Sequence, residues 1–169
     1  MKLVSINFSG GDIMESATNW RLKIALICYF LCVLFALTFS AIYLFRTEFM
    51  PYHAAAVEQS WAEVMPAYQI LVLALMKAAG GGWLSISIAV SILLFGPFRQ
   101  GVRWTFWAIP AIGLPALVVN LYITIYVTLK TPGNPPWQLN AVGIILLFIG
   151  FVLSITTETK ARTTLEGVS

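Results

Sequence analysis

Residues 22–45 read LKIALICYFLCVLFALTFSAIYLF, an apolar stretch with no charge after Lys23. A helix needs roughly 20 apolar residues to cross the ~30 Å hydrocarbon core of a bilayer, so this stretch is long enough to span one. Three further stretches have the same character, at residues 67–95, 104–129 and 137–155. The runs are continuous, without the alternation of barrel strands, and a spanning helix satisfies its own backbone hydrogen bonds. The sequence therefore predicts an all-α fold, a four-transmembrane-helix bundle.

The composition excludes an ordinary water-soluble domain. Of the 169 residues, 59% are hydrophobic and only 10% are charged, and the mean hydropathy is +0.85. Soluble domains average about 45–50% apolar and about 25% charged residues, so lipid must cover this chain. The net charge of +3 is small and forms no patch. We therefore expect membrane lipids as partners, with other membrane protein subunits or self-association as open alternatives, and no nucleic acid.

The distribution of Lys and Arg predicts the orientation, because these residues concentrate in cytoplasmic segments. Seven of the ten fall on one side of the membrane. These are Lys2, Arg21, Lys23, Arg99, Arg103, Lys160 and Arg162. Arg46 and Lys130 fall on the other side, and Lys77 lies within the second span. We therefore predict that both termini are cytoplasmic.

The chain is predicted to divide into a cytoplasmic arm at residues 1–20, a membrane domain at 21–157 and a cytoplasmic tail at 158–169. The longest connection in the domain, residues 46–66, lies on the outer side between the first and second spans. Its stretch PYHAAAVE, residues 51–58, begins with proline, which favours the first turn of a helix, and continues with strong helix formers. We therefore predict a short outer cap helix between these two spans.

The outer side also carries polar side chains that could form a site. The candidate outer polar pocket contains Glu48, His53, Glu58, Lys77 and Asn120. One interpretation is a functional pocket in which the single histidine, which titrates near neutrality when unperturbed, exchanges protons. The other is structural: Lys77 pairs with an outer carboxylate, Glu48 being the first choice, and ties the cap to the bundle.

The second span is rich in small residues, which let helix backbones approach closely in lipid. Those that recur at helical spacing, and so predict a helix-packing face, are Ala74, Ala78, Gly81, Ser85 and Ala89. The span is also longer than a bilayer needs. We expect it to tilt, to project beyond the outer surface, or to break at the glycines of residues 80–82, where a broken helix would expose carbonyls to a ligand.

Cys28 and Cys32 lie four residues apart on the first span and therefore on one face of its helix. Metal ligation would need further Cys or His nearby, and the single histidine lies on the opposite side of the membrane. We interpret the pair as core packing, since free cysteine behaves as a small hydrophobe. The sequence contains no zinc-protease, phosphate-loop or nucleophile-elbow motif, so no metal and no cofactor are predicted.

The stretch FRTEFMPYH at residues 45–53, followed by MKAAGGG at residues 76–82, resembles small bacterial four-span integral membrane proteins. The resemblance covers about residues 22–153 and implies a bacterial inner (plasma) membrane. It brings no assigned activity and therefore no functional residue.

Three functions stay open. The favoured hypothesis is a non-catalytic membrane protein, either an accessory subunit or a binder of a lipid or small apolar ligand. The alternative is an enzyme that acts on a lipid-soluble substrate at an outer-leaflet polar pocket, with Glu48, His53 and Lys77 as acid–base groups. A small transporter unit is the third, and it is disfavoured because no charge lies deep in the spans.

Overall fold

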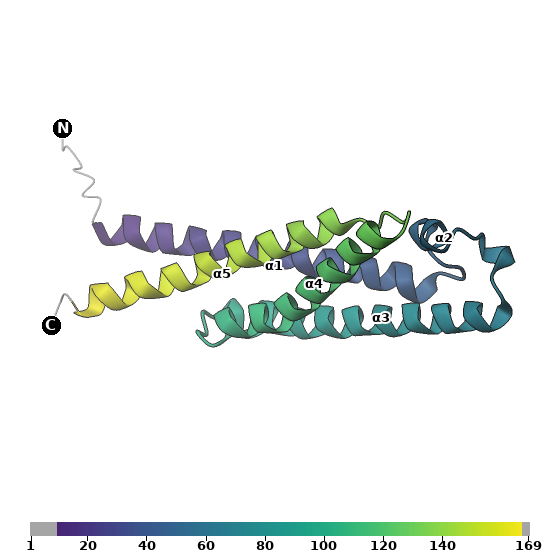
Figure 1. Cartoon of the computed structure of the whole chain (residues 1–169). Helices are drawn as coiled ribbons and strands as arrows, with labels where there is room; N and C mark the ends of the chain where they lie inside the picture. Colours follow the sequence, from purple (N-terminus) through teal and green to yellow (C-terminus); the bar gives the residue numbers. More distant parts are fainter. Residues whose placement is uncertain (1–9, 167–169) are drawn as a thin grey trace, which may run out of the picture.

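The computed structural model describes residues 10–166, with side chains from residue 20 to residue 157. Residues 1–9 of the predicted arm and 167–169 of the predicted tail lie outside the described residues. Over the described range the only regular elements are helices. They are α1 (Gly10–Phe45), α2 (Pro51–Val57), η1 (Trp61–Glu63), α3 (Pro66–Leu93), η2 (Leu94–Phe98), α4 (Thr105–Lys130) and α5 (Trp137–Glu166). In Figure 1, α1, α3 and α5 run along the bundle, and α4 crosses it obliquely.

Four segments are long and apolar enough to cross a membrane. They are Trp20–Phe45, Pro66–Phe98, Thr105–Lys130 and Trp137–Thr157. Large apolar side chains cover their outside, such as Ile70, Ile92 and Leu129, which are 72%, 66% and 75% exposed. A soluble monomer rarely exposes more than a few hundred Å² of contiguous apolar surface, so lipid is the solvent of these helices. The predicted all-α bundle of four spans is confirmed, and each predicted span overlaps one of these segments.

α1 packs against both α3 and α5, and small residues set both contacts. A Cβ added to Gly80 of α3 would lie 3.1 Å from the Ser40 carbonyl oxygen, and Ser40 Oγ donates to the Gly80 carbonyl at 2.8 Å. A Cβ added to Gly150 of α5 would lie 2.8 Å from the ring of Tyr29. Close backbone approach of this kind stabilises helix pairs in lipid through packing and interhelical hydrogen bonds.

α3 packs with a different face from the predicted one. Its buried residues are Met76, Gly80, Ser87 and Val90. Of the predicted face, Ala74, Ala78 and Ser85 are exposed, and Gly81 and Ala89 are half-buried. The two stripes are offset by two positions, about 200° around a helix, so they lie on opposite sides. Both stripes contain small residues, and spacing alone does not identify the one that the chain's own helices use.

α3 also continues unbroken through residues 80–82, so the predicted alternative of a break there is wrong. The helix passes instead into the π-helical turn η2, where Gly96 leaves helical geometry at φ −94° and ψ −105°. The next residue, Pro97, has no backbone N–H to donate. Gly101, at φ +73°, then completes the turn into α4 in a conformation that glycine adopts without strain.

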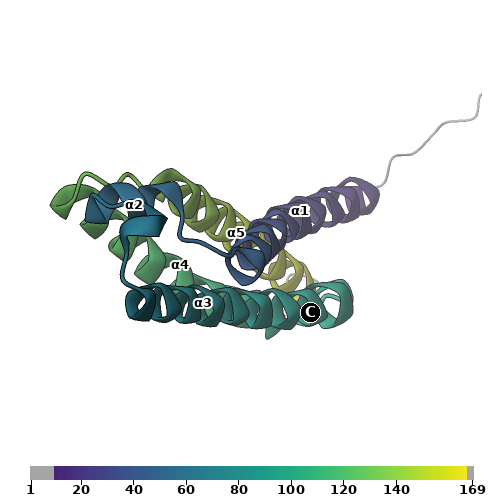
Figure 2. The ribbon, with the colours of Figure 1, turned by 90° about the vertical axis from the view of Figure 1, so that its right-hand side faces the viewer.

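The connection between α1 and α3 forms an ordered cap, as predicted. α2 begins at Pro51. η1 begins with a capping box in which Glu63 Oε2 accepts a hydrogen bond from the Ser60 N–H at 2.7 Å. Phe49 is buried against Trp61, with ring centroids 4.9 Å apart. Figure 2 shows α2 lying across the end of the bundle where α1 finishes and α3 begins. We call this end the capped end. The opposite end, where α1 begins and α5 finishes, is the terminal end.

The cap is attached to both sides of the bundle. On one side, a Cβ added to Gly133 in the α4–α5 loop would lie 2.6 Å from the Tyr52 carbonyl oxygen and 2.8 Å from Ala56 Cβ, so α2 rests directly on this glycine. On the other side, the hydroxyl groups of Tyr43 in α1 and Tyr52 in α2 form a hydrogen bond. The cap therefore links α1 to the α4–α5 hairpin.

Candidate functional site

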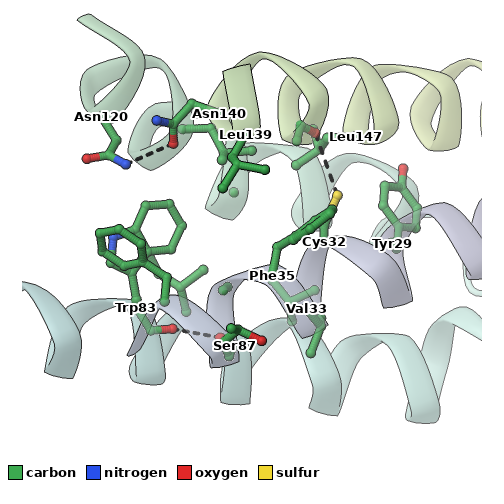
Figure 3. A pocket seen from close by; sticks show the side chains of 18 of the residues that line it. Tyr29, Cys32, Val33, Phe35, Trp83, Ser87, Asn120, Leu139, Asn140 and Leu147 are labelled. Atoms are coloured by element: carbon green, nitrogen blue, oxygen red, sulfur yellow. Dashed lines mark hydrogen bonds between the residues drawn. The ribbon is translucent and has the colours of Figure 1, made fainter. Parts of the chain in front are cut away.

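A cavity of about 160 Å³ lies between the four spans. α1 provides the longest part of its wall, from Tyr29 to Ile42, which corresponds to ~20 Å along a helix. The other spans contribute Trp83 to Val90 of α3, Ile109 to Asn120 of α4, and Leu139 to Leu147 of α5. Figure 3 shows Tyr29 at one end of the cavity and Asn120 with Asn140 at the other.

The cavity wall is largely apolar. None of the described residues that line it is Asp, Glu, Lys, Arg or His. Two of its hydroxyl groups bond to their own helix: Ser87 Oγ donates to the Trp83 carbonyl at 2.7 Å, and Thr38 Oγ1 donates to the Leu34 carbonyl at 2.9 Å. These two groups are satisfied without a ligand, so the middle of the cavity presents mainly carbon atoms.

The cavity opens sideways rather than being sealed inside the bundle. Phe35, Thr38 and Ile42 of α1 and Leu139 of α5 line it and are also exposed at the protein surface. These residues belong to helices that lipid surrounds, and Thr38, Ile42 and Leu139 lie toward the capped end of the cavity. A molecule dissolved in the bilayer can therefore reach the cavity without passing through water.

The polar end of the cavity is a relay of hydrogen bonds between α4 and α5. Asn120 Nδ2 donates to Asn140 Oδ1 at 2.8 Å, and Asn140 Nδ2 makes a longer contact of 3.5 Å with Thr124 Oγ1. The Thr124 hydroxyl in turn donates to the Asn120 carbonyl oxygen of its own helix at 2.9 Å. Only 9% of Asn140 is exposed, and buried amides of this kind are stable in lipid when they pair.

The other end of the cavity is closed by Tyr29, which is fully buried. Its ring meets the edge of Phe98, with centroids 5.5 Å apart. No group among the described residues makes a hydrogen bond of normal geometry with its hydroxyl. The neighbouring Ser154 hydroxyl donates to the Gly150 carbonyl at 2.7 Å. This end therefore presents an aromatic ring.

Among the described residues, no hydrogen bond or ion pair joins the predicted outer polar residues to one another. Glu48 and Glu58 are exposed, and Glu58 ends α2 in the left-handed region at φ 54°. Lys77 Nζ donates to the Leu44 carbonyl oxygen at 2.8 Å, so its observed partner is a backbone group and not the expected Glu48 carboxylate. Asn120 lies apart from the cap, in the cavity.

Two titratable groups of the cap, His53 and Glu63, have lowered pKa values. His53 is half-buried in α2, where burial lowers the pKa of its imidazole below the usual value of 6.5. Its Nδ1 accepts a hydrogen bond from the Met50 N–H at 3.3 Å, which fixes the neutral tautomer with the proton on Nε2. Hydrogen bonds from Ser60 lower the pKa of Glu63. Both groups stabilise helix starts, which is a structural role.

Cys28 and Cys32 are both free thiols on α1. Cys28 is buried, and Cys32 Sγ lies 3.6 Å from the Gly143 carbonyl oxygen of α5. Among the described residues, no group of three or more His, Cys, Asp or Glu side chains is placed to hold a metal ion. The two thiols occupy packing positions, and Cys32 also lines the cavity.

Sequence reasoning selected Asn120 but missed its partner Asn140 and the other polar residues of the cavity. Asn140 is visible in the sequence as an amide near the start of the fourth span. Ser87 and Tyr29 carry no such signal, because serine and tyrosine are common in spanning helices and only the packing shows which of them face a cavity.

Comparisons with models of protein families, with curated proteins and with solved structures found no match.

Proposed function

We propose that this integral membrane protein binds a small, uncharged and largely apolar molecule in the cavity between its four spans. One observation carries the proposal: all four spans contribute mainly carbon-bearing side chains to a single cavity that opens toward lipid. Such a wall offers dispersion contacts along the whole ligand and has little to offer an ion.

The size of the cavity supports an organic ligand rather than water. Apolar cavities of about 150 Å³ stay dry and bind benzene or xenon. The cavity here has a similar volume, about 160 Å³, and an open side through which a longer molecule can extend. Filling it restores the packing contacts that its wall lacks, which favours binding.

Catalysis finds less support in the arrangement of the side chains. Glu48 is exposed, while His53 and Lys77 are each engaged with the backbone, at Met50 and Leu44 respectively. Among the described residues, no hydrogen bond or ion pair joins these three side chains into the polar pocket that the enzyme hypothesis needs.

We also propose that both termini are cytoplasmic and that the membrane is a bacterial inner membrane. The support for the orientation is the bias of Lys and Arg, seven against two, which is typical of cytoplasmic segments. The capped end, with Arg46 and Lys130, would then face outward, and the ligand would enter from the outer half of the bilayer.

Photolabelling in lipid nanodiscs tests the binding proposal. The probe is a long-chain alkyl diazirine, whose activated carbon inserts into neighbouring side chains, and labelled peptides are identified by mass spectrometry. We expect labels on Cys32, Ala36 and Ser87, which line the cavity, in addition to labels on residues that face lipid.

Two matched variants on α1 make this test specific. Ala36→Leu fills the cavity, since Ala36 is buried in its wall, whereas Ala41→Leu makes the same change at an exposed position that does not line it. We expect the first variant to lose the labels on Cys32 and Ser87 and the second to keep them. If wild-type protein is labelled only on lipid-facing residues, or if both variants label alike, the proposal is wrong.

A further inference from the structure

We infer that the ligand of the cavity carries a hydroxyl group, and that this hydroxyl donates a hydrogen bond to the side-chain oxygen of Asn120. The inference rests on the proposed function, because it assigns the chemistry of a ligand in the same cavity. It makes the ligand an uncharged amphiphile, a long-chain or aromatic alcohol, rather than a hydrocarbon or an acid.

The hydrogen-bond relay between α4 and α5 has a direction. Thr124 uses its hydroxyl hydrogen for a carbonyl oxygen of its own helix, so toward Asn140 it can only accept. The Asn140 group that faces Thr124 must therefore be the N–H₂, which leaves Asn140 Oδ1 for Asn120 Nδ2 at 2.8 Å. While the Thr124 hydroxyl donates to its own helix, the opposite orientation would bring two acceptors face to face. The relay thus fixes both amides.

With both amides in this orientation, one acceptor at the end of the relay has no donor within the described part of the chain. The oxygen Asn120 Oδ1 has no hydrogen-bond donor among the described residues, although Asn120 lies in the cavity wall between two spanning helices. Figure 3 shows this oxygen turned away from Asn140 and from the Tyr29 end of the cavity. Asn120 is half-buried, and an acceptor that faces an apolar cavity rather than bulk water gains from a ligand donor.

The position of the acceptor matches the way an amphiphile lies in a bilayer. Asn140 is three residues into α5 from Trp137, or ~5 Å from the helix start. A hydroxyl at the relay would therefore lie near the membrane surface. The apolar tail would extend along α1 toward Tyr29, in the same direction as the neighbouring lipid chains.

The charge of the cavity restricts the head group further. A carboxylate or phosphate would need a basic partner when removed from water, and none of the described residues that line the cavity is basic. A ketone or an ether can only accept, so it would face Asn120 Oδ1 without a donor. A hydroxyl is the simplest head group that satisfies this oxygen.

Two isomeric ligands test the effect of the hydroxyl group while size and composition stay the same. Nonanol and octyl methyl ether have the same formula and a similar shape, but only nonanol can donate a hydrogen bond. Each is added to nanodiscs at matched mole fractions in the lipid, and its ability to block diazirine labelling of Cys32 is measured. In wild-type protein we expect nonanol to compete roughly five- to tenfold better, as one additional hydrogen bond predicts.

The double variant N120L/N140L removes the relay without leaving an unpaired amide. We expect its preference for nonanol to fall below about twofold, while the ether competes at least as well as in wild-type protein. If nonanol and the ether compete equally in wild-type protein, the hydroxyl inference is wrong and apolar binding stands. If neither isomer reduces Cys32 labelling, both the inference and the proposed function are wrong. Even if the double variant folds poorly, the comparison of the two isomers in wild-type protein tests the hydroxyl inference.

Discussion

Lys77 of α3 donates a hydrogen bond to the carbonyl oxygen of Leu44 in the last turn of α1, with Nζ and the oxygen 2.8 Å apart. The last carbonyl groups of a helix have no partner within the helix, and the negative end of the helix dipole favours a cation. The lysine therefore joins the two helices through a helix end rather than through an ion pair.

The first prediction is that Lys77→Met destabilises the bundle by about 1 kcal/mol, because it removes this bond and leaves the Leu44 carbonyl without it. Glu48→Gln should change little, since Glu48 is exposed. Unfolding in mixed detergent micelles of increasing denaturing strength measures both free energies. The double variant should show the sum of the two single effects. A coupling energy of about 1 kcal/mol or more would instead show that Lys77 and Glu48 interact as a pair.

The second prediction concerns the contact of α1 with α5 at Tyr29 and Gly150. Gly150→Ala adds a Cβ that would lie 2.8 Å from the Tyr29 ring, and we expect a loss of about 1–3 kcal/mol as the helices separate. Gly82→Ala is the matched control, because nothing lies within 4 Å of a Cβ at that position and alanine favours the helix. If Gly150→Ala is tolerated as well as the control, the helices do not pack this closely.

The four spans could be predicted because a long apolar run is a strong signal and few other structures satisfy the backbone in lipid. The cap could be predicted from Pro51 and the alanines that follow it. The packing face of α3 could not. In water, a polar stripe marks the outside of a helix, but in lipid both Ala74, which is exposed, and Met76, which is buried, are apolar.

The cavity was harder to predict than the fold, for geometric reasons. Counted along straight helices, Asn120 lies ~15 Å from the end of α4 and Asn140 lies ~5 Å from the start of α5, so they fall at different depths. The oblique path of α4 in Figure 1 brings them together. The partner of Lys77 is a backbone carbonyl, and a backbone carbonyl has no signature in a sequence.

The third prediction is that the cap loosens as the pH falls. Burial lowers the pKa of His53 below its usual value of 6.5, so below that value the unfolded segment binds a proton more readily than the folded one. Stability from this group is complete above about pH 6.5 and is lost as the pH falls toward the lowered pKa. Protonation of Nδ1 would also break its bond from the Met50 N–H.

Hydrogen exchange in α2 at pH 7.5 and at pH 5, corrected for the intrinsic effect of pH, measures this change. We expect faster corrected exchange at the lower pH in wild-type protein. His53→Gln should show no such difference, because glutamine does not titrate. Equal corrected exchange at both pH values in wild-type protein would mean that His53 does not control the cap.

The fourth prediction is the orientation. A reporter that is active only in the cytoplasm should be active when fused after Ser169 and inactive when inserted at Asn134, in the loop on which α2 rests. The physical reason is the bias of Lys and Arg toward the terminal side. Activity at Asn134 would reverse the orientation and would place the entrance of the cavity in the inner half of the bilayer.

The last prediction is that the two asparagines depend on each other for stability. Asn120→Leu alone leaves Asn140 Oδ1 without its 2.8 Å donor, and Asn140→Leu alone leaves the Asn120 amide without its acceptor. Each single change should destabilise the bundle by about 1–2 kcal/mol, within the range measured for polar pairs in spanning helices. The double change replaces both amides by side chains that pack in lipid, so it should be no worse than either single change. The resulting coupling energy, about 1 kcal/mol or more in a double-mutant cycle, would show that the pair acts as a unit. A coupling energy near zero would mean that each amide finds other partners. The direction of the relay would then no longer leave Asn120 Oδ1 without a donor, and the basis for a ligand hydroxyl there would be gone.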